Sequence, residues 1–338
     1  MTTLQQRLEA RPPPRVLVIQ TAFLGDTVFT SALVQSLAQK WPRAEIDLCV
    51  APRARDVAQA IPGVAHVHLF DKRGQDRGLT GLRRIAARLR TRQYPLAVLP
   101  HRSLRSALLA RLARIPERAG FADAAGALFY TARVRTQARA FIDKEADLVR
   151  ALGAQQAAMA LRPLAAWLGA ARAALGPFTA ERLASVCLGS EWETKIWPAP
   201  RVAALVQLLR GRGFVPVLLG GPRERALARE VNCGSLDTTG NSVGEALAIL
   251  SLSALAVGGD TGLVHAARAL GVPTVAVFGP TTPSVHNFGP RERAVSLGLD
   301  CSPCSAHGSR RCPLGHHRCL RDLDEDRVAA ACQAVLAV

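Results

Sequence analysis

A carboxylate stands at the start of a helix directly after the first predicted strand. The strand Arg15–Gln20 runs into the turn Thr21-Ala-Phe-Leu-Gly-Asp26-Thr, in which a glycine precedes the acid. Ligands of α/β proteins bind at the carboxyl ends of such strands, so Asp26 could act as a general base toward an acceptor hydroxyl. The structural alternative is that Asp26 caps the helix by accepting a backbone N–H.

A second glycine-rich turn, Gly259-Asp260-Thr261-Gly262-Leu-Val-His265, joins an apolar strand to a helix. Free N–H groups and the helix dipole make the start of a helix an anion site, and Gly262 would let a pyrophosphate approach the backbone. Asp260 could orient the turn, contact a sugar hydroxyl or cap the helix. His265 could contact the ligand or pack beneath the loop.

Two further loops follow predicted strands of the second half. The loop Gly189-Ser190-Glu-Trp-Glu-Thr194-Lys195-Ile-Trp-Pro offers two hydroxyls and one ammonium, which suit a phosphate, although Lys195 could also be a solvated lysine. In Gly-Gly-Pro-Arg-Glu224, the carboxylate of Glu224 could reach ribose hydroxyls, a weak indication by itself.

These loops need elements that place them together, and the chain supplies two series of alternating strands and helices. Strands that alternate with helices of this length predict an α/β fold with two Rossmann-like, doubly wound parallel-sheet domains. We expect domains at residues 1–172 and 173–338, on either side of a weakly patterned alanine-rich segment around 161–177, with the site in the cleft between them. The predicted strands are Arg15–Gln20, Glu45–Ala51, His66–Phe70, Tyr94–Pro100 and one toward Phe121, then Ala184–Leu188, Val215–Gly220, Ala254–Val257 and Pro273–Phe278. The predicted helices are 27–41, 79–91, 103–114, 201–210, 223–231, 243–250, 262–270 and a final one at about 324–336.

Length and composition limit the classes of protein. At 338 residues with 49% apolar and 20% charged residues, the chain is typical of a two-domain globular protein. Its polar, proline-containing start does not resemble a signal peptide, and it has no apolar run long enough to span a membrane. We therefore expect a cytoplasmic protein.

The net charge of +17 is concentrated in the first half of the chain. Residues 1–150 hold 25 Lys and Arg against 12 Asp and Glu, and the stretch 72–118 holds thirteen against two. Such a field attracts phosphates, acidic sugars or anionic lipid, unless the arginines only decorate solvated helices. We take Arg73, Arg102 and Arg105 as candidate contacts of an anionic acceptor.

Four cysteines stand close together near the end, in the segment 301–319. Cys301, Cys304, Cys312 and Cys319 are spaced C-x2-C-x7-C-x6-C, with histidines among them. Four thiolates could hold Zn or Fe tetrahedrally in a structural site, since no ligand position stays open for a substrate. The alternative is a loop with free thiols or one cysteine pair.

The order and spacing of these motifs resemble glycosyltransferase family 9, which contains the ADP-heptose:lipopolysaccharide heptosyltransferases. The resemblance is carried by L-G-D, S-x-x-x-T-K-x-W-P, G-G-P-x-E and above all G-D-T-G-x-x-H-x-A followed by A-L-G-V-P-T-V-A-x-F-G-P-T, and it covers the chain from about Arg15.

The resemblance implies an inverting GT-B enzyme that needs no cofactor for catalysis. It implies that the first domain binds the acceptor, the Kdo/heptose inner core of lipopolysaccharide, and that the second binds the donor, ADP-L-glycero-β-D-manno-heptose. It further implies peripheral contact with the cytoplasmic face of the inner membrane. By position, Asp26 matches the base, and Lys195 matches the group that stabilises the departing diphosphate. The implied donor contacts are Ser190, Thr194, Lys195, Glu224, Asp260, Thr261, Gly262 and His265.

Three alternatives remain open. The same fold could act on a protein acceptor or use another nucleotide sugar. The charge also suits a two-lobed ligand- or nucleic-acid-binding protein, although clustered aromatic residues for base stacking are missing. A nicotinamide dehydrogenase is disfavoured because the fingerprint G-x-G-x-x-G is absent from the sequence.

Overall fold

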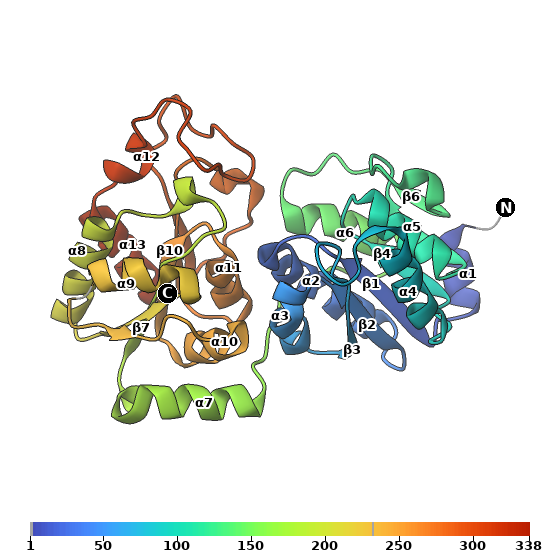
Figure 1. Ribbon diagram of the computed structural model, residues 1–338, viewed down its shortest axis with the longest axis horizontal. Coiled ribbons are helices and arrows are strands. Elements are labelled where there is room, and N and C mark those ends of the chain that lie inside the picture. The colour runs from blue at the N-terminus through green and yellow to red at the C-terminus, as the bar shows by residue number, and fades with distance from the viewer. Residues whose placement is uncertain (1–2, 232) are drawn as a thin grey trace. The chain divides into compact units, whose positions relative to one another are not determined.

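The computed structural model describes residues 3–231 and 233–338. The chain divides into two compact units, Met1–Arg162 and Pro163–Val338. Each unit is one parallel six-stranded sheet with helices packed on it (Figure 1). The predicted α/β class with two doubly wound sheets is therefore confirmed.

The sheet of the first unit has the strand order β3-β2-β1-β4-β5-β6. Val16 of β1 is paired with Ile46 of β2 on one side and with Leu96 of β4 on the other. The strand order reverses between β1 and β4, and ligands bind at such a switch point, beyond the carboxyl ends of the strands. Its helices and strands are α1 (Leu4–Ala10), β1 (Arg15–Gln20), α2 (Leu24–Lys40), β2 (Glu45–Val50), α3 (Arg55–Ala60), β3 (Val64–Leu69), α4 (Gly78–Arg90), β4 (Leu96–Leu99), α5 (Leu104–Leu112), β5 (Glu117–Phe121), β6 (Ala132–Val134) and α6 (Phe141–Ala151).

The second unit repeats this order as β12-β11-β10-β7-β8-β9, with its switch point between β7 and β10. Val257 of β10 is paired with Val186 of β7 and with Val275 of β11. Its elements are α7 (Ala165–Leu175), β7 (Leu183–Cys187), α8 (Ala199–Gly211), β8 (Val215–Leu219), α9 (Arg225–Val231), β9 (Leu236–Asp237), α10 (Val243–Leu252), β10 (Leu255–Gly259), α11 (Gly262–Ala269), β11 (Thr274–Val277), β12 (Glu292–Val295), α12 (Arg318–Arg321) and α13 (Glu325–Leu336).

The inner strands of both sheets are buried on both faces, which explains their nearly continuous apolar sequences. In the first core, Leu17 and Ile19 pack with Leu82 and Ile85 of α4. In the second core, Val257 belongs to the same cluster as Val206 of α8 and Val328 of α13. Full burial of one such side chain contributes about 1.5–3 kcal/mol.

Most predicted strands and helices are present near their predicted positions, but the sequence did not predict the strands β6, β9 and β12 or the helices α1, α3, α6 and α12. The strands β6, β9 and β12 are short and partly exposed, so they lack the apolar run that identifies a strand. Helix α1 was missed because only Leu4 and Leu8 of its seven residues are buried.

The alanine-rich segment is a helix of the second unit. Helix α7 packs on α10 so closely that a Cβ atom on Gly244 would lie 2.4 Å from the Trp167 ring. The unit boundary therefore precedes α7, whereas the predicted boundary after residue 172 falls inside this helix.

In the part of the chain that the structure describes, no helix combines the length and the apolar character needed to cross a bilayer.

Candidate active site

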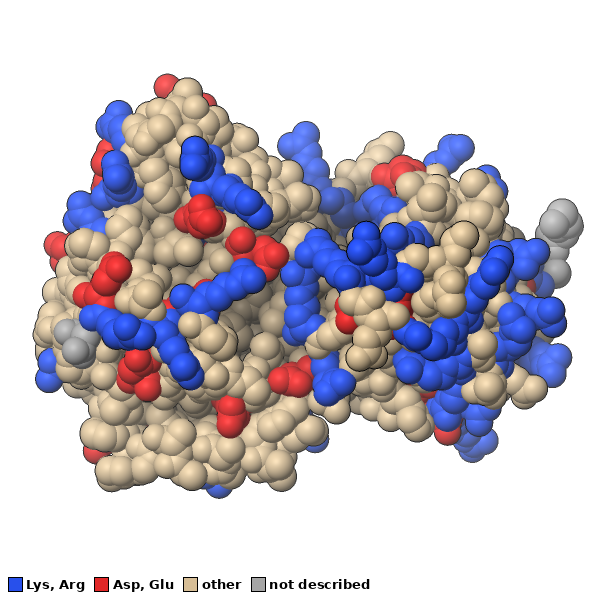
Figure 2. All heavy atoms as spheres, viewed as in Figure 1, with Lys and Arg blue, Asp and Glu red and all other residues tan. Residues whose placement is uncertain are grey.

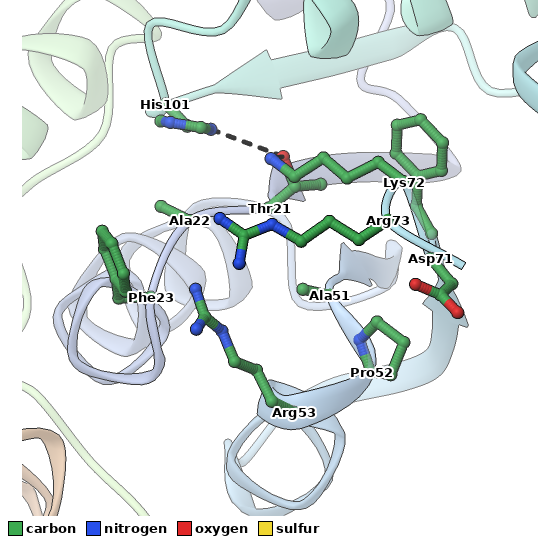
Figure 3. Close-up of a pocket in the computed structure, with 11 residues that line it drawn as sticks. Thr21, Ala22, Phe23, Ala51, Pro52, Arg53, Asp71, Lys72, Arg73 and His101 are labelled. Atoms are coloured by element: carbon green, nitrogen blue, oxygen red, sulfur yellow. Dashed lines mark hydrogen bonds between the residues drawn. The ribbon is translucent and has the colours of Figure 1, made fainter. Parts of the chain in front are cut away.

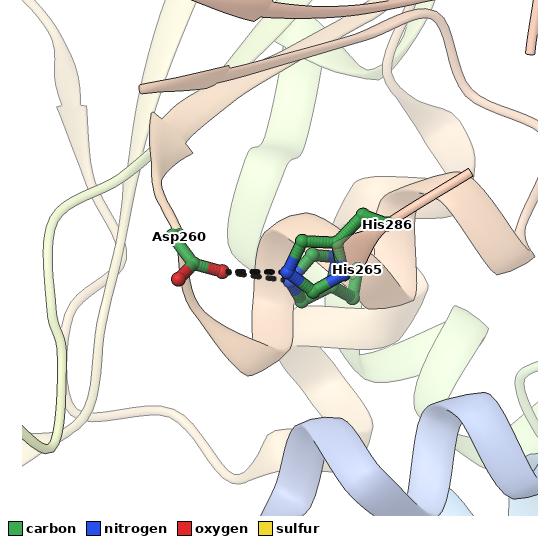
Figure 4. Close-up of side chains that lie close together, drawn as sticks. All are labelled: Asp260, His265 and His286. Carbon is green, nitrogen blue, oxygen red and sulfur yellow. Dashed lines mark hydrogen bonds and ion pairs between the residues drawn. The ribbon is translucent and has the colours of Figure 1, made fainter. Parts of the chain in front are cut away.

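Asp260 is the centre of a network of polar side chains at the switch point of the second sheet. It follows β10 directly and is 6% exposed. Its Oδ2 atom lies 2.6 Å from Lys195 Nζ and accepts a hydrogen bond from Thr281 Oγ1 at 2.7 Å. Its Oδ1 atom lies 3.0 Å from His265 Nε2 and 3.6 Å from His286 Nε2 (Figure 4). Loops after β7, β10 and β11 thus meet on one carboxylate.

Burial alone would raise the pKa of Asp260. The hydrogen bond from His265 and the positive charge of Lys195 outweigh burial, so the pKa lies well below its usual range and the group is ionised. Burial lowers the pKa of His265, and the contact with Asp260 opposes this only in part. Burial, with a smaller effect of His265, lowers the pKa of His286 to about 3. Both rings are therefore neutral at pH 7.

Hydrogen bonds fix the tautomer of His265. Arg268 Nη1 lies 3.2 Å from Nδ1, and a guanidinium can only donate. Nδ1 therefore accepts, and Nε2 carries the hydrogen that is donated to Asp260.

Asp260, His265 and His286 also form a group of metal-binding atoms within 4.8 Å of one another. A metal bound through His265 Nε2 would require the other tautomer of this ring, so His265 would lose both its hydrogen bond to Asp260 and the one from Arg268. The network as it stands is suited to binding polar groups of a ligand.

The start of helix α11 adds a site for an anion. Thr261 precedes the helix in an extended conformation, and its buried Oγ1 has no hydrogen-bond partner among residues 3–231 and 233–338. Gly262 begins the helix, whose first N–H groups have no partners within the helix itself. A buried hydroxyl beside free helical N–H groups suits a phosphate oxygen.

Glu224 lies against two glycines at the ends of neighbouring strands. A Cβ atom on Gly189, after β7, would be 2.5 Å from Glu224 Cδ, and one on Gly220, after β8, would be 2.6 Å from Glu224 Cβ. Any side chain at these positions would displace Glu224. In the first of these loops, Ser190 Oγ accepts the N–H of Trp192 at 3.2 Å.

Thr194 of the same loop has a different environment. It is 4% exposed, and its Oγ1 donates to Ser309 O at 2.8 Å and accepts Ser309 N–H at 2.9 Å. Both contacts are with the cysteine-rich segment.

In the first unit, Asp26 lies in the first turn of α2, beyond the carboxyl end of β1. It is half-buried, and its Oδ2 accepts the N–H of Phe23 at 3.0 Å. The capping role that the sequence suggested is therefore present. This hydrogen bond also fixes the orientation of the carboxylate, which a general base requires.

A pocket of about 370 Å³ opens at the same sheet edge. Arg53, Lys72, Arg73 and His101 line it after β2, β3 and β4, and the two guanidinium groups lie on one side (Figure 3). Burial lowers the pKa of Lys72, and the charges of Arg73, Arg105 and Arg53 lower it further. An anion in this pocket would relieve that repulsion.

Of the predicted acceptor contacts, only Arg73 lines this pocket. Arg102 forms an ion pair with Asp123 at 2.8 Å and stacks over Phe121. Arg105 donates to Lys72 O at 3.3 Å and is exposed. Sequence reasoning missed Arg53, Lys72 and His101. Their positions directly after predicted strands could have indicated them.

A buried carboxyl group, Glu145 of α6, lies next to the first turns of α2. Thr30 Oγ1 is 2.8 Å from Glu145 Oε1 and 2.9 Å from Asp26 O, and it accepts Gln20 Nε2 at 3.1 Å. A threonine hydroxyl has one hydrogen. All three contacts are satisfied when this hydrogen goes to Asp26 O and a protonated Glu145 donates to Thr30. Burial raises the pKa of Glu145 to about 8. The charge of Asp26 also raises this pKa, and a hydrogen bond from Thr30 to the ionised carboxylate would lower it.

The four clustered cysteines lie near enough to one another to affect each other's pKa values. Burial raises the pKa of Cys319 to about 11, and Cys304, Cys312 and Cys301 add to the shift. Burial would also raise the pKa of Cys312, but backbone N–H groups from Leu314 to His317 lower it overall. Among the described residues, these sulfurs do not form a group within 4.8 Å of one another. The donor set has the chemistry of a thiolate metal site.

The raised pKa of Glu145 makes stability depend on pH. Between 4.5 and about 8 the unfolded chain has lost this proton and the folded chain keeps it, so stability falls as pH rises. We expect the free energy of unfolding of wild type to fall by about 1.4 kcal/mol per pH unit relative to Glu145→Gln across this window. Urea unfolding from pH 5 to 9 measures it. Parallel pH profiles of the two proteins would contradict a protonated Glu145.

Comparison with known proteins identifies the family. A family model described as glycosyltransferase family 9 (heptosyltransferase) matches residues 82–315. Lipooligosaccharide heptosyltransferase 2 of Haemophilus ducreyi is 26% identical over 96% of this chain and 99% of that protein. Lipopolysaccharide heptosyltransferase 1 of Pseudomonas aeruginosa is 28% identical over 93% of this chain and 92% of that protein.

Solved structures share the fold. A family 9 glycosyl transferase from Veillonella parvula gives a TM-score of 0.84 at 20% identity, over 96% of this chain and 97% of that one. Escherichia coli heptosyltransferase WaaC with ADP-2-deoxy-2-fluoro heptose gives 0.69 at 20% identity, over 94% and 98%. The iron-containing dodecameric glycosyltransferase TibC of enterotoxigenic E. coli gives 0.59 at 14% identity, over 96% and 79%. Because the family model covers more than half of the chain, this protein belongs to glycosyltransferase family 9 and is a glycosyltransferase.

Proposed function

We propose that this enzyme transfers heptose from ADP-L-glycero-β-D-manno-heptose to the Kdo/heptose inner core of lipopolysaccharide, with inversion at the anomeric carbon. The observation that carries the proposal is the Lys195–Asp260 pair beside Thr261 at the start of α11, whose buried hydroxyl has no hydrogen-bond partner in the described part of the chain. These groups suit a sugar diphosphate. The heptosyltransferase relatives of H. ducreyi and P. aeruginosa support the sugar and the acceptor class.

In this proposal the second unit binds the donor. Ser190, Lys195, Thr261 and Gly262 contact the diphosphate, and Glu224 reaches the ribose. Asp260 and His265 face the sugar, since an ionised carboxylate and a neutral imidazole suit hydroxyl groups. The loop that contains Thr194 carries Lys195 to this place.

The first unit binds the acceptor. Arg53, Lys72 and Arg73 present three cations in a pocket at the sheet edge that also holds Asp26. A Kdo carboxylate or a lipid A phosphate matches this charge.

The transfer needs one displacement. Asp26 takes the proton of the acceptor hydroxyl as its oxygen forms a bond to the anomeric carbon. The bond from that carbon to the diphosphate breaks, and ADP leaves with the electron pair. Lys195 and the N-terminus of α11 stabilise the developing negative charge. A single displacement inverts the anomeric centre, and no catalytic metal is included.

Heptose transfer from ADP-heptose to Kdo-containing lipid A, with and without a first heptose, tests the proposal. We expect Asp26→Asn to lower kcat by at least about 10²-fold, because an amide accepts no proton at neutral pH. An asparagine can still accept the Phe23 N–H, so this variant should unfold like wild type, whereas Asp26→Ala should lose about 1 kcal/mol.

The readouts are ADP release, acceptor mass and thermal melting. Equal kcat in wild type and Asp26→Asn would leave Asp26 as a cap only. Transfer by wild type to a protein acceptor, or from another nucleotide sugar alone, would overturn the substrate assignment.

We also propose a structural Zn or Fe ion held by Cys301, Cys304, Cys312 and Cys319. TibC is iron-containing, and the thiol set here has suitable chemistry. We expect about one metal ion per purified chain. Cys301→Ser with Cys304→Ser should remove it, and Cys233→Ser, in a thiol outside the segment, should not. Elemental analysis of the purified proteins measures their metal content. Wild type that contains no metal after purification from iron- and zinc-replete cells would refute this site.

Membrane contact is proposed through the basic face of the first unit. Lys and Arg side chains gather over this unit in Figure 2. Leu79 of α4 is 65% exposed between Arg77 and Arg83. Replacing Arg77 and Arg83 by Glu should weaken binding to anionic vesicles by about fivefold or more per site, while Arg229→Glu in the second unit should not. Co-sedimentation measures this, and equal binding to neutral vesicles would contradict it.

A further inference from the structure

The cysteine-rich segment 301–319 contacts the Lys195 loop through backbone and side-chain hydrogen bonds. Thr194 N and Oγ1 both donate to Ser309 O, at 3.1 and 2.8 Å, and Ser309 N donates back to Thr194 Oγ1. His317 Nε2 lies 2.8 Å from Thr194 O, and since a carbonyl only accepts, this ring nitrogen donates. Lys195 is the next residue in the chain.

The Thr194 hydroxyl both donates and accepts a hydrogen bond within this contact. Its one hydrogen is donated to Ser309 O, one lone pair accepts Ser309 N–H, and the residue is buried. The side chain is therefore bound to the segment and has no hydrogen left for a phosphate oxygen.

Gly308 brings the segment against the side chain of Lys195. A Cβ atom on Gly308 would be 2.8 Å from Lys195 Cδ and 2.7 Å from Trp192 Cβ. The backbone of Gly308 is also left-handed, with φ +98°. Only glycine allows the segment to approach the lysine stem this closely.

The same segment contacts the loop that carries Thr281. Cys304 N and Ser305 N both donate to Pro280 O, at 3.0 and 3.1 Å. Thr281 and Lys195 contact the same oxygen of Asp260, so one segment supports both neighbours of that oxygen.

We propose that residues 301–319 clamp the donor loops and that Thr194, Gly308 and His317 are positioning residues, which hold Lys195 at Asp260 without touching the donor. This inference rests on the proposed function, because it assumes that Lys195 binds the donor diphosphate. Donor affinity then depends on the folded state of the cysteine segment. By linkage, a bound nucleotide stabilises the segment to the same degree.

Equilibrium binding of ADP, measured by calorimetry, tests the clamp independently of transfer. We expect Gly308→Ala to raise the Kd by about tenfold, because its Cβ displaces the Lys195 stem. The matched control is Gly298→Ala. Gly298 is also left-handed, with φ +62°, but a Cβ there meets nothing within 4 Å, so ADP should bind nearly as in wild type. A Gly308→Ala variant that melts like wild type and binds ADP equally would overturn the clamp.

Two further arms cover the event that Gly308→Ala does not fold. Thr194→Val should weaken ADP binding and Thr194→Ser should restore it. His317→Phe should also weaken ADP binding, because it removes a second hydrogen bond between the segment and the same loop. In wild type, ADP should slow maleimide labelling of Cys301, Cys304 and Cys312 relative to Cys233, read by mass spectrometry. Unchanged labelling would count against the clamp.

If Thr194→Val loses ADP affinity while the affinity of His317→Phe and the labelling rates are unaffected, Thr194 contacts the phosphate directly and the clamp is wrong. Wild type that binds no ADP would instead overturn the donor assignment and this inference with it.

Discussion

A buried ionised carboxylate needs a donor for each lone pair that water no longer reaches, and Asp260 imposes this demand on the second unit. Lys195 comes from the loop after β7, Thr281 from the loop after β11 and His265 from α11. Arg268 in turn fixes the ring of His265, and Glu292 accepts the Nε–H of Arg268 at 2.8 Å. The order β11-β10-β7 is the arrangement that brings these three loops to one point.

Glu145, a buried acid of the first unit, is stabilised in the opposite way from Asp260. Glu145 has no cation beside it in the contacts described above, and burial raises its pKa to about 8, which favours its neutral, protonated form at pH 7. The charge of Asp26, one turn before Thr30, contributes to the raised pKa of Glu145.

Local sequence was sufficient to predict the residues that directly follow strands. A glycine turn between an apolar run and a helix identifies Asp26, Asp260, Thr261 and Gly262 without knowledge of the sheet order. The sheet order itself is not local information. Arg53, Lys72 and His101 share one pocket only because β2, β3 and β4 end at the same edge, which a scan of single loops does not show.

Long-range pairs were the least predictable part of the site. Glu145 meets Thr30, and Ser309 meets Thr194, across 115 positions of sequence in each case. Nothing near Thr194 distinguishes a hydroxyl that binds phosphate from one that binds another loop. The alanine-rich helix α7 was missed for a related reason, because its assignment depends on Trp167 packing over Gly244.

Each unit is formed by one continuous piece of chain, and the last helix, α13, packs on β11 and α8 within its own unit. During translation every residue of the first sheet is therefore synthesised before the first residue of the second sheet. Domains fold as units in this order. The first unit, which contains Asp26 and the buried Glu145, can close its core while Lys195 and Asp260 are not yet translated, so nascent folding of one half does not wait for the other.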